Sequence, residues 1–301
     1  MDPAEFFVLP DGRLRAGWRL LLFAVFFVIA AILFHGLAAV FFRGQATHSQ
    51  MALLAAASVA GLASVWLATW LMMSLIEHQT FWAVGLERGG RSFGELALGL
   101  ASGSGMVGAI VTIEWAMGTI HFQTSGTTAH ETFILIGAST GILAVAAASE
   151  ELLFRGYAFQ RLIEGTNGYA ALSISAVIFG WLHKANPYST GLSVVNTMLA
   201  GVVLSLAYLK TRALWLPIGF HFSWNWTLAM LGLPVSGIGL AKMPWRALAV
   251  SSHTWLYGGD YGPEGGIVAT IVLLAGVVCL AGICEKNPQP VNAGAFVADS
   301  S

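Results

Sequence analysis

The feature that most constrains the fold of this chain is a recurrence of apolar runs about 20 residues long, separated by short polar segments. A helix of about 20 apolar residues crosses the roughly 30 Å hydrocarbon core of a bilayer. Hydrophobic residues make up 56% of the 301 positions and charged residues only 10%, whereas soluble domains carry about 25% charged residues. The sequence therefore predicts an all-α, polytopic membrane protein.

Eight segments predict about eight transmembrane helices in one helical membrane domain over residues 1–286, followed by a disordered tail at 287–301. The first run, Leu20–Phe42, exceeds the roughly 7–15 apolar residues of a signal peptide, so we interpret it as a retained span. The fourth segment is long, and its polar second half is expected to extend beyond the hydrocarbon. The predicted spans are 17–42, 51–76, 94–118, 133–163, 170–184, 191–210, 213–233 and 265–284.

The distribution of charge predicts the orientation. Eight spans place both termini on one side, and the segments on that side hold most of the Lys and Arg residues. The positive-inside rule then places both termini in the cytoplasm. The link 234–264 holds four aromatic residues that suit a membrane interface, namely Trp245, Trp255, Tyr257 and Tyr261.

Net charge and the sequence motifs also limit the binding partners that we expect. A net charge of −1 gives no indication of a nucleic-acid partner. The glycines of the stretch 99–108 are not followed by the Lys-Ser/Thr signature of a phosphate loop, so they predict close helix packing and no nucleotide site. Membrane lipid is the expected surrounding.

Two adjacent carboxylates, Glu150 and Glu151, interrupt the fourth apolar segment. Ionisable residues inside a membrane span are costly, so they indicate a functional site. Glu151 and Arg155 are spaced i,i+4 and can pair on one helix face. Glu150 points about 100° away from Glu151 on a helix, so the two carboxylates need not share a role.

Three polar residues in later spans can meet these carboxylates. His183 lies near the end of the fifth segment, and His221 and Asn225 are spaced i,i+4 in the seventh. At 1.5 Å per residue, Glu150 and these three lie roughly 12–20 Å from the predicted cytoplasmic ends of their spans. The similar depths predict a shared cavity that opens toward the cytoplasm. Glu114, a lone acid in the third segment, is assigned no firm role.

A buried carboxylate beside imidazoles can activate a water molecule, which indicates hydrolysis of a peptide bond. In that hypothesis Glu150 is the base, His183 holds the water, and His221 with Asn225 stabilises the oxyanion. A metal such as zinc, held by Glu150, His183 and His221, and a metal-independent reaction both stay open. A proton-coupled transporter and a non-catalytic membrane scaffold are alternatives that use the same buried acids.

Three ordered motifs in this region resemble those of the CPBP intramembrane protease family, also called the type II CAAX prenyl protease or abortive-infection family. Glu-Glu-x-x-x-Arg matches residues 150–155, Phe-x-x-x-His matches Phe179 and His183, and His-x-x-x-Asn matches His221 and Asn225. The resemblance covers about residues 130–235. In the first three spans it extends only to hydrophobicity.

The resemblance implies an intramembrane endopeptidase of about eight spans that acts on a peptide or protein substrate. It implies that the residue at position 150 activates water with help from His183, and that His221 and Asn225 form the oxyanion site. Glu151 is counted with these catalytic residues, since it sets the electrostatics of Glu150 together with Arg155, and Arg155 and Phe179 are the supporting residues. Prenylated or other membrane-associated peptides are the implied substrates, and a bacterial inner membrane is the implied location.

Overall fold

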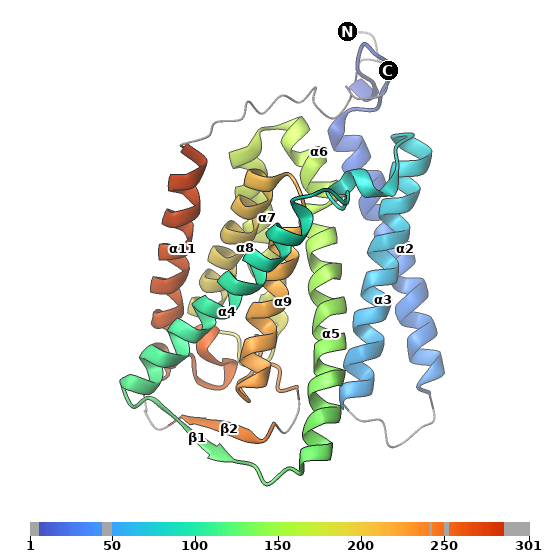
Figure 1. Cartoon of the computed structure of the whole chain (residues 1–301). Helices are drawn as coiled ribbons and strands as arrows, with labels where there is room; N and C mark the ends of the chain where they lie inside the picture. The colour runs from blue at the N-terminus through green and yellow to red at the C-terminus, as the bar shows by residue number, and fades with distance from the viewer. Residues whose placement is uncertain (1–5, 44–49, 241–242, 250–252, 286–301) are drawn as a thin grey trace.

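The computed structural model of the chain describes residues 6–43, 50–240, 243–249 and 253–285. The predicted tail 287–301 lies outside the described residues. The long helix α5 (Ala129–Arg155) runs through the molecule between two groups of helices (Figure 1). The other long helices are α2 (Ala16–Phe41), α3 (Gln50–Leu71), α4 (Ser92–Ala116), α6 (Tyr157–Gly165), α7 (Gly168–Leu182), α8 (Gly191–Thr211), α9 (Trp215–Met230) and α11 (Ile267–Glu285).

Shorter elements connect these helices. The π-helical turn η1 (Met72–Ile76) extends α3, η2 (Phe81–Val84) precedes α4, and η3 (His183–Ala185) follows α7. The link between α9 and α11 holds β2 (Trp245–Ala249), α10 (Thr254–Tyr257), η4 (Gly259–Tyr261) and η5 (Pro263–Gly265). Strand β1 (Ile120–Thr124) pairs antiparallel with β2, with Ile120 opposite Ala249. The all-helical prediction is confirmed apart from this small sheet.

Each of the eight predicted spans corresponds to helix in the structure. Within the described residues, five helical segments are long and apolar enough to cross a membrane: Ala16–Phe41, Gln50–Ile76, Ser92–Ala116, Ala129–Gly165 and Gly191–Thr211. Helices α7 and α9 contain only 15 and 16 residues. The number of spans, about eight, therefore stays a prediction.

The fourth predicted span, 133–163, is not one straight helix. A capping box of Thr128 and Glu131 starts α5, and the helix ends at Arg155. Gly156 follows with non-helical backbone angles, and a Cβ atom there would collide with the carbonyl oxygen of Leu152. The chain then turns into α6, a separate amphipathic helix. The hydrophobic pattern concealed this break because apolar residues continue on both sides of it.

The buried side chains form two apolar clusters. The first draws mainly on α4, α9 and α11, and the second mainly on α2, α3 and α6. Three helices contribute to both clusters: α5 through Leu143 and Leu152, α7 through Phe179 and Ala171, and α8 through Leu204 and Leu206. Large apolar side chains on the outside, such as Ile32 and Phe41 of α2, are exposed as lipid-facing residues would be.

Close packing of α4 against α9 holds the seventh predicted span in place. A Cβ atom on Gly99 would lie 2.8 Å from the backbone nitrogen of Phe220, and Gly103 faces the same helix. Such small residues let transmembrane backbones approach closely. The prediction of close packing for this glycine stretch is confirmed at these two positions, whereas a Cβ atom on Gly105 or Gly108 would meet no described atom within 4 Å.

A buried ion-pair network fixes α6 against α2 and the end of η1. Arg19 contacts Glu77 at 3.0 Å and also Glu164, and Arg161 contacts Glu77 at 3.1 Å and Glu164 at 3.2 Å. The hydroxyl of Tyr157 donates to Glu77 at 2.6 Å. Burial by itself would raise the pKa of Glu77, but the two guanidinium groups and this hydroxyl outweigh it and lower that pKa.

The link between α9 and α11 lies at the end of the bundle opposite the start of α2 (Figure 1). The interfacial prediction fits Trp245 and Trp255, which are exposed, but it is wrong for Tyr257 and Tyr261, which are buried. These two tyrosines pack inward because the link folds back over the helix ends, with Gly237 N donating to the carbonyl of Tyr261.

Candidate functional site

The predicted pair of Glu151 and Arg155 is formed and fully buried. Arg155 Nη1 lies 3.2 Å from Glu151 Oε1, and neither side chain is exposed. The same carboxylate oxygen lies 2.7 Å from Nδ1 of His221 on α9. Arg155 also donates to the carbonyl of Gly201 on α8 at 3.1 Å. Glu151 therefore ties three helices together and fixes the orientation of the His221 ring.

Glu150 faces a different set of atoms, as the 100° offset predicted. Its Oε2 lies 3.9 Å from Nε2 of His183 and 3.8 Å from Nε2 of His221. These separations are longer than a hydrogen bond. Glu150 Oε2 is buried and has no hydrogen-bond partner among the described residues, although 37% of the Glu150 side chain is exposed. The two imidazoles and this oxygen thus converge without direct bonding.

The hydrogen bonds of each ring define where its protons lie. His183 Nδ1 is 2.7 Å from the carbonyl oxygen of Phe179, and a carbonyl oxygen can only accept a hydrogen bond. His221 Nδ1 faces the Glu151 carboxylate in the same way. Both Nδ1 atoms are therefore donors, and both Nε2 atoms face Glu150.

Phe179 packs at the centre of these groups, as predicted. Its ring lies 4.5 Å from the ring of His183 and 6.0 Å from that of His221, between centroids. The guanidinium of Arg155 stands 4.7 Å from the ring centroid. This cation–π contact helps to stabilise a buried arginine.

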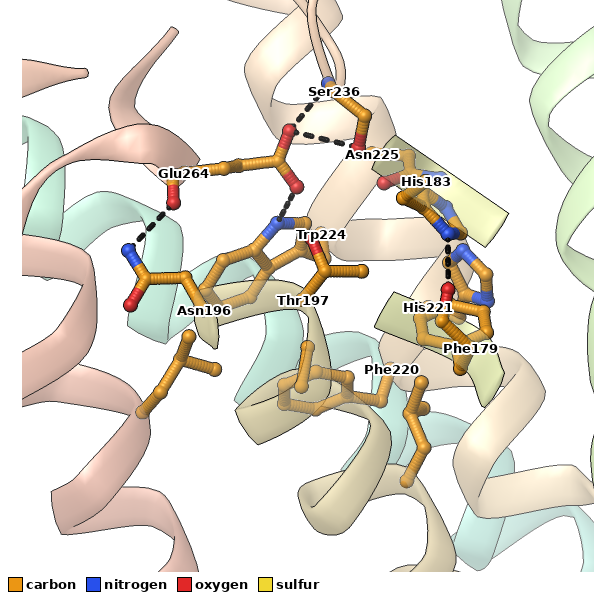
Figure 2. A pocket seen from close by; sticks show the side chains of 13 residues that line it. Phe179, His183, Asn196, Thr197, Phe220, His221, Trp224, Asn225, Ser236 and Glu264 are labelled. Carbon is orange, nitrogen blue, oxygen red and sulfur yellow. Dashed lines mark hydrogen bonds between the residues drawn. The ribbon is translucent and has the colours of Figure 1, made fainter. Parts of the chain in front are cut away.

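Asn225 joins the two histidines in one pocket (Figure 2). The pocket is bounded by α7, α8, α9 and α11 together with the link. Its polar lining residues are His183, Asn196, Thr197, His221, Asn225, Ser236 and Glu264. The structure thus brings the residues of the second and third motifs together in one pocket, and Glu150 of the first motif lies beside the two histidines.

Glu264 was not predicted as a site residue. It follows Pro263 in a link that the sequence analysis assigned to the membrane interface. Its carboxylate accepts hydrogen bonds from Trp224 Nε1 at 2.8 Å and from the backbone and hydroxyl of Ser236 (Figure 2). The only signal in the sequence was an acid directly before the last apolar run.

The described residues give no support to the metal site that the sequence left open. In the part of the chain that the structure describes, no group of three or more His, Cys, Asp or Glu side chains is placed to hold a metal ion, including the predicted set of Glu150, His183 and His221.

Glu114 is buried on α4 with both carboxylate oxygens unpartnered among the described residues, and it does not line the pocket.

The opening of the cavity toward the cytoplasm stays a prediction. His183 directly follows α7, at the end away from the start of that helix. Ser236 and Glu264 belong to the link at the end of the bundle opposite Ala16 (Figure 1). The pocket therefore lies toward the end of the bundle that is far from the start of α2, so a cytoplasmic N-terminus and a pocket that opens to the cytoplasm at this end do not agree with one another.

The class of protein defined by these features is a multi-pass helical membrane protein with an acid–histidine cluster inside its helix bundle. The model of the type II CAAX prenyl endopeptidase Rce1-like family matches residues 131–227, from the first turn of α5 to α9. No curated protein matches the chain. The match includes all three motifs, and it confirms the family predicted from them. The match supports a CAAX-type protease and does not favour the transporter or scaffold alternatives.

Proposed function

We propose that this protein is an intramembrane endopeptidase in which Glu150 activates water to hydrolyse a peptide bond of a membrane-associated, including prenylated, substrate. The observation that carries the proposal is the convergence of His183 Nε2 and His221 Nε2 on the unpartnered Glu150 Oε2, at 3.9 and 3.8 Å. Polar atoms at such separations are suited to bridging by a water molecule.

The two histidines have different environments, which favours different roles. Nδ1 of His183 faces a neutral carbonyl, so the neutral ring presents the lone pair of Nε2 toward Glu150. Nδ1 of His221 faces the carboxylate of Glu151, which stabilises a positively charged ring. His183 would accept a hydrogen bond from the water, and His221 would donate from Nε2 to a developing oxyanion.

The reaction then follows from these positions. Glu150 takes one proton from the water, and the resulting hydroxide attacks the carbonyl carbon of the scissile bond. The oxyanion accepts hydrogen bonds from His221 Nε2 and from the side-chain amide of Asn225. Protonated Glu150 returns its proton to the leaving amine as the carbon–nitrogen bond breaks. All groups in this sequence belong to the chain, its water and the substrate.

Glu151 and Arg155 would act through His221 and would not touch the substrate. Their paired charges hold the imidazole in one orientation and offset the cost of burying it. Activity should therefore depend on both acids, for separate reasons.

The test is cleavage of quenched fluorescent peptides by the purified protein in liposomes. The panel contains a prenylated peptide with three residues after its modified cysteine, the same peptide without the prenyl group, and an apolar transmembrane peptide. Glu150→Gln is expected to abolish cleavage while the thermal unfolding midpoint stays close to that of the wild type. Glu87→Gln, at an acid outside the pocket, is the matched control.

Wild-type cleavage that persists in Glu150→Gln would refute the role of this carboxylate. Failure of the wild type to cleave any of the three peptides would count against the substrate class proposed.

A further inference from the structure

We propose that Glu264 is a positioning residue of this site, which fixes α9 so that His221 and Asn225 face the pocket. The inference rests on the proposed function, since its role is to orient the oxyanion groups. Glu264 lies outside the segment 131–227 matched by the family, yet it lines the same pocket as His183 and His221.

The carboxylate joins α9 to the link with both of its oxygens. Oε1 accepts a hydrogen bond from Nε1 of Trp224 at 2.8 Å. Oε2 accepts from the backbone nitrogen of Ser236 and from its hydroxyl, the latter at 3.2 Å. Figure 2 shows the carboxylate between these two residues, on the wall opposite His221. One side chain thus bridges α9 and the link at the pocket.

The backbone around Glu264 is itself anchored, so the bridge is rigid. The amide of Asn196 on α8 donates to the carbonyl oxygens of Glu264 and Gly266, each at 2.8 Å. Thr270 on α11 donates to Asn196 Oδ1 at 2.7 Å. Glu264 is consequently fixed by α8 and α11, and Trp224 is held against that fixed point.

Trp224 is the residue of α9 through which this restraint reaches the site. It lies three residues after His221 and directly before Asn225. Its ring is buried and stacks on Phe220 with 5.7 Å between centroids. A rotation of α9 by about 10° would move atoms roughly 6 Å from the helix axis by about 1 Å. Misplacement by about 1 Å can lower a rate by about 100-fold.

The electrostatics of Glu264 also indicate a specific role. Burial raises the pKa of Glu264, and the hydrogen bonds from Ser236 and Trp224 offset only part of this effect. A charged carboxylate at this position is therefore costly to the fold. A neutral residue that merely filled the space would avoid that cost.

The test is a double-mutant cycle of Glu264→Gln and Trp224→Phe, with Asp260→Asn as the matched control at an exposed acid of the same link. Trp224→Phe removes the indole donor and keeps an aromatic ring. Each single variant is expected to lower kcat by about tenfold or more, with KM within about threefold of the wild type. The double variant should be no slower than the slower single variant, because both changes remove one interaction.

A second measurement does not depend on cleavage. The His221 signals in nitrogen-15 NMR spectra of histidine-labelled protein, identified with His221→Gln, should shift in Glu264→Gln and Trp224→Phe and stay unchanged in Asp260→Asn. If the wild type cleaves no peptide but these shifts appear, the inference holds and the substrate class fails. Independent, additive losses of kcat, a change confined to KM, or unchanged His221 signals would overturn the inference.

Discussion

Replacing Gly99 by alanine should disturb the site through the α4–α9 contact. The new Cβ atom would lie 2.8 Å from the backbone nitrogen of Phe220, the residue before His221, and closer still to the carbonyl of Leu216. Ordinary contact begins near 3.4 Å, so the contact with Phe220 alone requires α9 to move by about 0.6 Å, and the contact with Leu216 requires more. Backbone atoms cannot rotate away as a side chain could, so the displacement is passed to His221.

The expected effects follow from that displacement. If about 1 Å of misplacement lowers a rate by about 100-fold, 0.6 Å corresponds to roughly tenfold in kcat. Overpacking of this kind also destabilises a fold by about 1–3 kcal/mol. Gly99→Ala should therefore cleave peptide at least about ten times more slowly than the wild type and unfold at a lower temperature in detergent.

Gly105→Ala is the control, because it makes the same change on α4 where no described atom lies within 4 Å. It is expected to keep full activity, and alanine is the better helix former by about 0.5–1 kcal/mol. Equal activity and equal unfolding midpoints in the two variants would refute the reasoning about close approach.

Three further predictions concern charge and orientation. Glu151→Gln leaves its arginine partner buried and unpaired, so the free energy of unfolding should fall by about 3–5 kcal/mol. Glu150→Gln should show no comparable loss of stability in thermal unfolding. Equal unfolding midpoints for Glu151→Gln and Glu150→Gln would contradict the structural role given to Glu151. Because the pKa of Glu77 is lowered, its contribution to stability is present above about pH 4.5 and is lost as the pH falls through the lowered value. The midpoint difference between the wild type and Glu77→Gln should accordingly be larger at pH 7 than at pH 3.5, and a constant difference would exclude this linkage. In a cysteine-free background, an impermeant thiol reagent should label Tyr188→Cys in intact cells and Arg13→Cys only after permeabilisation; the reverse would place the Glu264 end of the pocket in the cytoplasm.

The sequence predicted the helices well because each span is set by local hydrophobicity. The i,i+4 pairing of Glu151 with Arg155 was also predictable, since it depends on one helix alone. The approach of Glu150 to His183 and His221 was predictable because polar residues in apolar spans have few alternatives to one another.

Features that depend on distant contacts could not be predicted in the same way. The break at Gly156 lies inside a continuous apolar pattern. The partners of Arg19 are 58 and 145 residues away along the chain, so no local spacing in the sequence predicts these ion pairs. Glu264 reaches the site only because the link folds back onto Trp224, a long-range contact that the sequence pattern does not predict.

The two apolar clusters joined by α5 have a consequence for how the molecule senses its surroundings. The ion-pair network anchors α2 and α6 within one cluster, whereas the glycine contact anchors α4 and α9 within the other. Glu150 lies on α5, one of three helices that contribute to both clusters, whereas His221 lies on α9, which packs in the first. We expect a relative movement of the two clusters, such as one imposed by a thinner bilayer, to change the distance between Glu150 and His221. The boundary between the clusters is thus also the place where bilayer thickness can act on the chemistry.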